Sequence, residues 1–259
     1  MPEAAQFTAI AGLPEIEVGD DLASLIAAAL EARRITLQPY DVIVVAQKIV
    51  SKAEGRCIEL DSISPSPRAQ RLAELTRKDP RLVELILGEA EEIVRAVPGV
   101  LIVRHRLGFV MANAGIDRSN VPPSPGAGAP RERALLLPRD PDASAAELRR
   151  RWLERFGARI GVIVSDSFGR AWRRGVHNVA LGSAGLPALI DRRGERDRAG
   201  RVLEGTEVAF ADAIASAAAL VMGEAAEGTP VVLVRGLEWS APECPASALL
   251  RPKSEDLFR

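Results

Sequence analysis

The chain has 259 residues, of which 47% are hydrophobic, so it can bury the core of one large domain or of two closely joined lobes. Its 34 basic and 35 acidic side chains leave a net charge of -1, which excludes a general attraction to nucleic acid or membrane. Without a signal peptide, a dense cysteine pattern or an apolar run near the roughly 18 residues that span a bilayer, we expect a cytoplasmic protein with reduced Cys57 and Cys244.

The N-terminal part of the chain predicts a helix followed by a strand. Asp21 precedes residues 22–30, where apolar side chains recur every three or four positions, as in a helix that packs on a core. The run 41–46 is short and strongly apolar, which is typical of a buried strand. It leads into the polar segment 47–56, so a charged stretch follows the end of this strand.

The next part predicts helices and then a hairpin. Residues 66–97 favour one or two helices, interrupted before Pro80 because the residue preceding a proline is pushed out of the helical region. The runs 101–104 and 109–112 favour two strands joined by a turn around Gly108.

Two acids follow predicted strands. Asp117 lies in the segment 113–120, directly after the strand 109–112, and Asp166 comes after the apolar run 160–164. Ligands gather at strand ends in sheet-containing folds, so the two carboxylates are candidates to meet at one site. Asn, Gly and Asp are also ordinary turn residues, and on its own the segment around Asp117 fits a capped turn better.

The segment 165–175 is the most informative, and we expect it to form a surface loop. It contains one carboxylate, two hydroxyls and three guanidinium groups. A carboxylate beside a hydroxyl suits Mg²⁺ or Mn²⁺, and Arg forks suit phosphate oxygens, so the segment predicts a site for a metal-bound nucleotide. A polar loop with a surface ion-pair cluster explains the same residues without any function.

A Pro- and Gly-rich segment and a helix lie between these two acids. Residues 122–130 predict an exposed loop, which is either a lid or an untethered surface insertion. Ser144 opens a capping box, which predicts the start of a helix that continues to Phe156 and ends at Gly157.

The last third predicts strands and one further helix. Thr206 is a candidate cap for a helix that ends at Gly223. Glu224 then lies in a loop of small residues, where an acid can coordinate a metal ion and backbone N–H groups can approach phosphate. A loop that only connects a helix to a strand would have the same sequence pattern. Strands are expected at 176–181, 186–190 and 231–235.

Five segments carry a resemblance to a known family. They occur in the family's order and cover nearly the whole chain: 12–16, 51–56, 113–120, 166–175 and 222–224. Together they resemble the coenzyme F420-0:L-glutamate ligases, which add γ-linked glutamates to a deazaflavin coenzyme. The resemblance implies a homodimer of mixed α and β structure, and we expect an α+β fold with mixed sheets and two intimately joined lobes. It also implies a single catalytic domain over residues 1–259, without the C-terminal flavin-reductase-like domain that some relatives carry.

The resemblance further implies roles for individual residues. The expected GTP site comprises Gly12, Leu13, Pro14, Glu15, Gln47, Lys48, Lys52, Asn120, Met222, Gly223 and Thr229. Two ions, Mn²⁺ or Mg²⁺, are expected at Asp117, Asp166, Ser167 and Glu224, with K⁺ as a further candidate ion. Arg170, Arg173 and Arg174, with Asp166, are the expected catalytic residues, and the three arginines would bind the phosphodiester of the deazaflavin precursor or the carboxylates of L-glutamate.

The implied reaction fits the residue inventory. A carboxyl of the deazaflavin precursor would attack the γ-phosphate of GTP, and the amine of L-glutamate would displace phosphate from the acyl phosphate. Such chemistry needs metal ions and cationic side chains to neutralise charge, and no protein nucleophile. We therefore assign the two histidines, His105 and His177, to structure.

Three other classes of protein stay open. A metal-dependent nucleotide phosphohydrolase would use the same acids and arginines. An RNA-binding module could use Arg149–Arg151 and the arginines of 165–175, but aromatic residues make up only 4% of the chain and no RNA platform is recognisable. A non-catalytic dimeric scaffold would explain the core and leave the acids unexplained.

Overall fold

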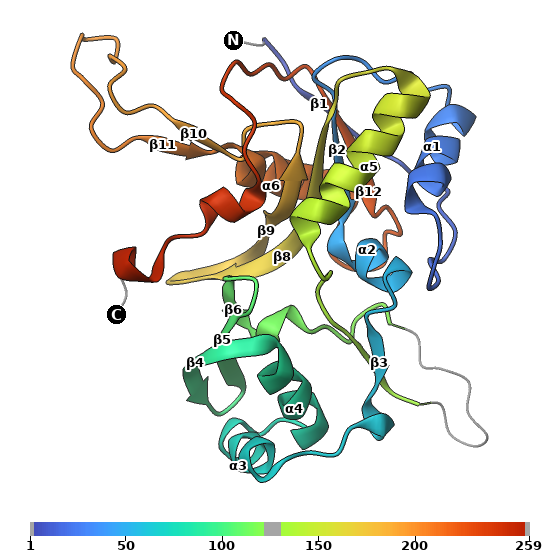
Figure 1. Ribbon diagram of the computed structural model, residues 1–259, viewed down its shortest axis with the longest axis vertical. Helices are drawn as coiled ribbons and strands as arrows, with labels where there is room; N and C mark the ends of the chain where they lie inside the picture. The colour runs from blue at the N-terminus through green and yellow to red at the C-terminus, as the bar shows by residue number, and fades with distance from the viewer. Residues whose placement is uncertain (1–2, 122–130, 257–259) are drawn as a thin grey trace.

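The fold was established from a computed structural model, which describes residues 3–121 and 131–256. The predicted Pro- and Gly-rich loop, 122–130, lies outside the described residues. The molecule is α+β with mixed sheets, as expected. Its centre is a five-stranded sheet whose strands, in spatial order, are β1 (Gln6–Ala9), β12 (Val231–Arg235), β2 (Val42–Ala46), β8 (Gly161–Arg170) and β9 (Arg173–Ala184) (Figure 1).

The central sheet has one parallel strand pair, and this pair locates the site. β2 and β8 run parallel, from Val42 opposite Gly161 to Ala46 opposite Ser165, while each of the other neighbouring pairs is antiparallel. β2 stops at Ala46, whereas β8 continues to Arg170 in a long hairpin with β9. The end of β2 therefore leaves one edge of β8 open beyond Ser165.

Helices cover both faces of the central sheet. α1 (Leu22–Ala32) and α5 (Pro141–Phe156) pack on one face, where Trp152 Nε1 donates a 2.9 Å hydrogen bond to the Ala23 carbonyl. α6 (Phe210–Met222) packs on the other face. The strands are buried on both sides and read as continuous apolar runs: on β2, Ile43 and Val45 pack on the side of α1 and α5, and Val42 and Val44 pack on the side of α6.

A glycine allows α5 to approach the sheet closely. At Gly182 in β9, a Cβ atom would lie 2.0 Å from the carbonyl oxygen of Pro141, in the first turn of α5. No side chain fits in this space, so glycine is required where the start of α5 crosses the strand.

A second core surrounds a three-stranded antiparallel sheet. Its strands are β4 (Ala90–Val97), β5 (Val100–His105) and β6 (Val110–Ala112). α3 (Pro67–Thr76) and α4 (Pro80–Glu89) cover this sheet, and Val83, Ile86, Leu101 and Val103 are buried between them. The β8–β9 hairpin reaches this sheet (Figure 1). The rings of Phe168 and Phe109 lie 6.0 Å apart there in an edge-to-face contact.

Shorter elements complete the chain. α2 (Gln47–Ala53) follows β2 at once, and two small antiparallel pairs join β3 (Cys57–Glu59) with β7 (Arg133–Leu135) and β10 (Leu189–Asp191) with β11 (Glu207–Ala209). Short 3₁₀ turns occupy Leu60–Ser62, Asn113–Gly115, Ala246–Leu249 and Lys253–Glu255.

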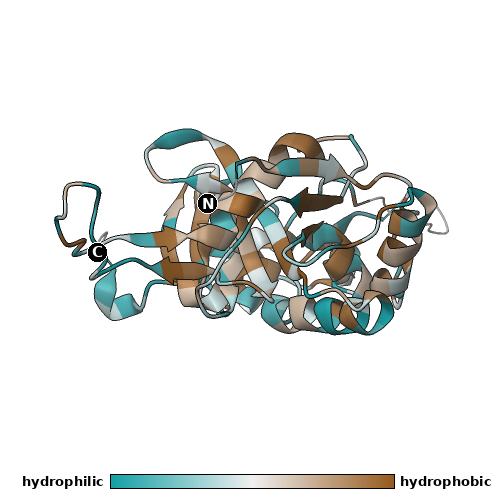
Figure 2. Cartoon of the chain, turned by 90° about the horizontal axis from the view of Figure 1, so that it is seen from above, coloured by the Kyte–Doolittle hydropathy of each residue, from teal (hydrophilic) through white to brown (hydrophobic). Residues whose placement is uncertain are grey.

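Hydropathy follows the arrangement of these layers. In Figure 2, hydrophobic residues are concentrated in strands inside the molecule, while hydrophilic stretches lie along outer helical turns and the projecting hairpins. Within residues 3–121 and 131–256, no helix has the length and apolar character needed to cross a membrane.

Several predicted elements are confirmed. The helix after Asp21, the strand at 41–46, the hairpin around Gly108 and the strand at 231–235 are all present. α5 ends at Gly157, which has a left-handed φ of 67°, and α6 ends at Gly223. Cys57 and Cys244 are both free thiols.

Other predicted elements are wrong, each for a local reason. No helix was predicted in the polar segment 47–56, which begins with α2. The predicted helix over 66–97 stops at Glu89, because residues 90–97 pair with β5. α5 begins at Pro141 rather than near Ser144: the Asp140 side chain accepts a hydrogen bond from the Ala143 N–H and proline takes the first helical position.

The predictions of a surface loop at 165–175 and of a helix N-cap at Thr206 are also wrong. Residues 165–170 belong to β8, and β9 begins at Arg173, so the segment 165–175 forms the end of the β8–β9 hairpin. The predicted strand at 176–181 is part of β9, and that at 186–190 shortens to β10. Residues 207–209 pair with β10, which delays α6 to Phe210.

Candidate active site

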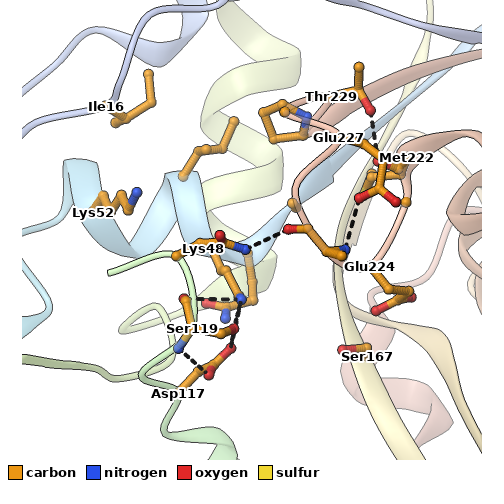
Figure 3. Close-up of a pocket in the computed structure, with 18 of the residues that line it drawn as sticks. Ile16, Lys48, Lys52, Asp117, Ser119, Ser167, Met222, Glu224, Glu227 and Thr229 are labelled. Carbon is orange, nitrogen blue, oxygen red and sulfur yellow. Dashed lines mark hydrogen bonds and ion pairs between the residues drawn. The ribbon is translucent and has the colours of Figure 1, made fainter. Parts of the chain in front are cut away.

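A cavity of about 760 Å³ lies where the parallel strands β2 and β8 end. Open sheets gather ligands at the carboxyl ends of their parallel strands, because loops from neighbouring connections converge there. The described residues that line it come from five parts of the chain: 13–16, 46–49 with Lys52, Asp117 with 119–121, 165–167 with Asn178, and 222–230 (Figure 3).

Asp117 is fixed in this cavity by both its backbone and its side chain. Its N–H donates to the Leu135 carbonyl at 3.0 Å, and its own carbonyl accepts from the Leu135 N–H at 2.8 Å. Lys48 Nζ lies 2.6 Å from Asp117 Oδ2, and the Ser119 hydroxyl donates to the same oxygen at 2.8 Å. Burial alone would raise the pKa of Asp117, but the hydrogen bonds from Lys48 and Ser119 outweigh it and hold the pKa below its ordinary value.

Asp166 has the opposite electrostatic environment. Burial of its carboxyl, together with the negative charge of Asp117, raises the pKa to about 7, although the Ser167 N–H, Lys48 and Gln47 act in the opposite direction. The two carboxylates therefore repel each other in one cavity. A bound cation would relieve this repulsion, which makes the pair suitable for metal binding.

Three buried polar atoms that line the cavity have no hydrogen-bond partner. They are Gln47 Nε2, Ser165 Oγ and Asn178 Oδ1. Buried polar groups in proteins are nearly always paired, so unpaired ones beside a cavity indicate positions that a ligand, ion or water would satisfy.

The loop after α6 closes the cavity on the side opposite α2. Gly223 has φ +81°, and a Cβ there would lie 2.3 Å from the Glu227 side chain. Glu227 in turn accepts a 2.8 Å hydrogen bond from the Ala225 N–H, and Thr229 donates to the Met222 carbonyl at 2.7 Å. Asn120 Nδ2 donates to the Ala225 carbonyl at 2.9 Å, so this loop is tied to the Asp117 segment.

The structure brings most of the predicted site residues to this cavity. Those that line it are Leu13, Pro14, Glu15, Gln47, Lys48, Lys52, Asn120, Met222, Gly223, Thr229, Asp117, Asp166, Ser167 and Glu224. Lys52 forms an ion pair with Glu15 at its rim. Gly12 is absent from the lining, although it immediately precedes Leu13.

The three predicted arginines lie elsewhere. Arg170, Arg173 and Arg174 are at the tip of the β8–β9 hairpin, beyond the part of β8 that lines the cavity, and all three are exposed. Arg170 there donates a 3.0 Å hydrogen bond to the Arg174 carbonyl, which tightens the turn. Their predicted catalytic role remains a prediction.

Three further residues of the site were not assigned from the sequence. Ser119 lies two residues after Asp117, and an Asp-x-Ser sequence predicts a turn in which the hydroxyl donates a hydrogen bond to the carboxylate. Ser165 directly precedes Asp166. Asn178 has no local signal, because only the pairing of β9 with β8 places it opposite Ser167.

The donor set fits hard divalent cations. In the part of the chain that the structure describes, no three His, Cys, Asp or Glu side chains form a preformed metal cluster. The cavity instead offers the paired acids Asp117 and Asp166, one further acid, Glu224, and neutral hydroxyl and amide oxygens, two of which are unpaired and buried. Mg²⁺ and Mn²⁺ accept such oxygen ligands and commonly retain water and bind substrate phosphates.

Known proteins resemble this chain over most of its length. The profile of a family described as F420-0:Gamma-glutamyl ligase matches residues 12–236. The chain belongs to this family. That match includes every segment that lines the cavity, so the family assignment and the cavity concern the same residues.

Named relatives of the family align over most of the chain. A Coenzyme F420:L-glutamate ligase of Methanopyrus kandleri is 51% identical over 249 residues, covering 95% of this chain and 94% of the relative. Proteins of the same name from Methanothermobacter thermautotrophicus and Archaeoglobus fulgidus are 48% and 43% identical, and each alignment covers 96% of this chain and at least 94% of the relative.

Proposed function

We propose that this chain is a GTP-dependent ligase that adds L-glutamate in amide linkage to the deazaflavin coenzyme F420-0. The observation that carries the proposal is the pair of acids, Asp117 and Asp166, facing one cavity together with Lys48. The description of the family supplies the acceptor, F420-0, and the names of the relatives supply the amino acid. The fold alone would not identify either substrate.

The residues of the cavity divide naturally between nucleotide and metal. Lys48 and Lys52 on α2 supply positive charge for the phosphates, and the small-residue loop 222–230 brings backbone N–H groups to the same space. Asp117 and Asp166 would hold one divalent cation, and Ser167 and Glu224 a second. When bound, these ions would supply charge neutralisation at the phosphoryl group.

The proposed reaction joins two substrates through an activated carboxyl. A carboxylate oxygen of the deazaflavin precursor forms a bond to the γ-phosphorus of GTP while the bond from that phosphorus to the β–γ bridging oxygen breaks, giving an acyl phosphate and GDP. The amine of L-glutamate then attacks the acyl carbon, loses a proton and releases inorganic phosphate. The protein contributes positioning and charge: lysines toward the phosphates, and acids toward cations.

The larger assembly is part of the same proposal. We propose that the two cores correspond to two joined lobes of a single catalytic domain over residues 1–259, that the enzyme is a homodimer, and that it works in the cytoplasm. In such a dimer, exposed apolar side chains are candidates for burial: Leu220 on α6 is 86% exposed and Val176 on β9 is 53% exposed.

Mass spectrometry of the deazaflavin tests the proposal. The protein is incubated with F420-0, GTP, Mn²⁺ and L-glutamate, and the expected result is an added glutamyl mass together with GDP and phosphate. Omission of glutamate should suppress GTP turnover. GTP hydrolysis that proceeds equally without glutamate, and with no glutamyl product, would instead identify a metal-dependent nucleotide phosphohydrolase.

A further inference from the structure

Two of the unpaired buried oxygens lie on β8 and β9, outside the predicted metal ligands. Ser165 is 2% exposed and Asn178 is 4% exposed, and neither Ser165 Oγ nor Asn178 Oδ1 has a hydrogen-bond partner. Both residues line the cavity. Burying a polar atom without a hydrogen-bond partner costs free energy. A purely structural role for these two oxygens would not explain why the fold accepts this cost.

Strand register places these oxygens beside Ser167. Ser165 and Ser167 are two positions apart on β8 and therefore share one face of the sheet. Ser167 is directly opposite Asn178 on β9, so their side chains are neighbours on that face. Asp166 is opposite Val179 and points to the other face, the side on which Phe168 and Val179 pack.

The charge of this part of the cavity suits a cation. Glu224 projects from the loop after α6 toward Ser167 (Figure 3). The two cationic side chains among the described lining residues, Lys48 and Lys52, both belong to α2 and are paired with Asp117 and Glu15. Ser165, Ser167, Asn178 and Glu224 thus present three neutral oxygens and one carboxylate without a competing lysine.

We infer that Ser165 and Asn178 are oxygen ligands of the second divalent cation, together with Ser167 and Glu224. This inference rests on the proposed function, since it assumes that two cations enter the cavity. It separates the two ions physically: Asp117 and Asp166 serve one side of β8, and the hydroxyl and amide group serves the other.

A hydrogen-bond chain from α6 holds Asn178 in place. The Ser216 hydroxyl donates to the Asn178 backbone carbonyl at 2.7 Å, so this hydroxyl must accept the 3.2 Å contact with His177 Nδ1. The strand is thereby fixed to α6 at the residue that carries the amide oxygen. Ser216 and His177 act as positioning residues, which orient a ligand without contacting the ion.

Mn²⁺ binding tests the inference without measuring catalysis. Free Mn²⁺ is followed by electron paramagnetic resonance while the metal alone is titrated into the whole protein and into Ser165→Ala and Asn178→Ala. The parent should bind two ions, and each variant should bind one of them at least about tenfold more weakly. Asn178→Asp, which keeps an oxygen at the same position, should retain both ions.

Thermal melting without metal separates a ligand role from a structural one. Because Ser165 Oγ has no partner to lose, Ser165→Ala should melt at or above the temperature of the parent. Ser183→Ala is the matched control, since Ser183 is equally buried on β9 but its hydroxyl contacts the Cys244 carbonyl and lies outside the cavity lining. It should bind two ions with parental affinity.

The possible failures are distinguishable. If the parent binds two ions and the Ser165 and Asn178 variants match it, the inference is overturned while the proposed function stands. A parent that binds one ion, with unchanged affinity in both variants, also overturns the inference. A folded parent that binds no Mn²⁺, with or without GTP, overturns the inference and the proposed function together.

Discussion

Asp166 is the residue on which activity should depend most directly. Asp166→Asn removes one of two repelling charges at nearly constant side-chain size, so we expect an intact fold, an undiminished melting temperature at pH 8 and product formation lowered by on the order of 100-fold or more. Mass spectrometry of the product and circular dichroism check both parts. Glu238→Gln, an exposed neutralisation outside the cavity, should leave activity unchanged; parental activity in Asp166→Asn would contradict the assignment.

Lys48 should matter for binding more than for folding. Lys48→Met removes the partner of Asp117 and a positive charge in the cavity, so the affinity for GTP should fall roughly tenfold or more, while stability changes by no more than about 1 kcal/mol because the pair is partly exposed. Calorimetric titration and urea unfolding measure the two effects. Lys253→Met, which breaks a surface pair with Glu92, is the control and should bind GTP normally.

The sequence predicted individual site residues where the signal lies in the residues next to them. Asp117 and Asp166 could be predicted because each acid follows a readable apolar strand. Asn178 could not, because its place in the site depends on a register shift opposite Val164 and Ser165, where β9 carries one extra residue, Leu181. A bulge shifts every later pair of facing residues on the two strands by one position. No residue type near it in the sequence predicts it.

Among the elements, the end of α4 carries a cluster of charged side chains around Glu89. The Glu89 carboxylate receives Arg56 at 2.9 Å and Arg106 at 3.1 Å, and His105 Nε2 lies 3.3 Å away. His105 Nδ1 accepts the Leu107 N–H, which leaves its proton on Nε2, facing Glu89. Arg56 follows α2 closely, so this cluster joins the helix that carries Lys48 to α4 and β5.

Glu89→Gln should therefore destabilise the protein in a pH-dependent way. Burial raises the pKa of Glu89, but His105, Arg56 and Arg106 outweigh it and lower the pKa to about 2. A lowered pKa stabilises the fold above the unfolded value of about 4.3, and this contribution disappears as pH falls toward 2. Urea unfolding should show a loss of about 3 kcal/mol at pH 7, shrinking between pH 5 and pH 2. An equal loss at pH 7 and pH 2 would contradict this explanation.

The elements that the sequence misassigned are those in which pairing overrides local pattern. Residues 90–97 continue a helical composition from α4, yet they join β5 because Ile93 and Ala96 then pack in the second core. The tip at 170–175 contains three arginines and a glycine, which are typical of a loop, but strand pairing continues as far as Arg170 and Arg173. Long-range contacts that decide such cases are not visible in a short window of sequence.

For the whole molecule, the cavity is a junction of distant parts of the chain. A ligand that contacts α2, the Asp117 segment and the 222–230 loop at once stabilises all of them together. A non-hydrolysable GTP analogue with Mn²⁺, each at 100 times its dissociation constant, should add about 2.7 kcal/mol for one linked binding event and raise the melting temperature by roughly 5–10 °C. Differential scanning fluorimetry measures this shift, ATP analogues provide the comparison, and an unchanged melting temperature would count against a nucleotide site.

The overhang of β8 past β2 has a consequence for how the protein can change. Successive positions 165, 166 and 167 face alternate sides of one ribbon, so a single inserted or deleted residue upstream of them would exchange acid for hydroxyl on both sides at once. A point substitution alters one side chain, whereas a one-residue shift in the register of β8 moves all three side chains to the opposite face of the sheet. Length changes in this lineage should consequently be confined to the hairpin tip and the β10–β11 arm, which carry none of the side chains proposed to hold an ion.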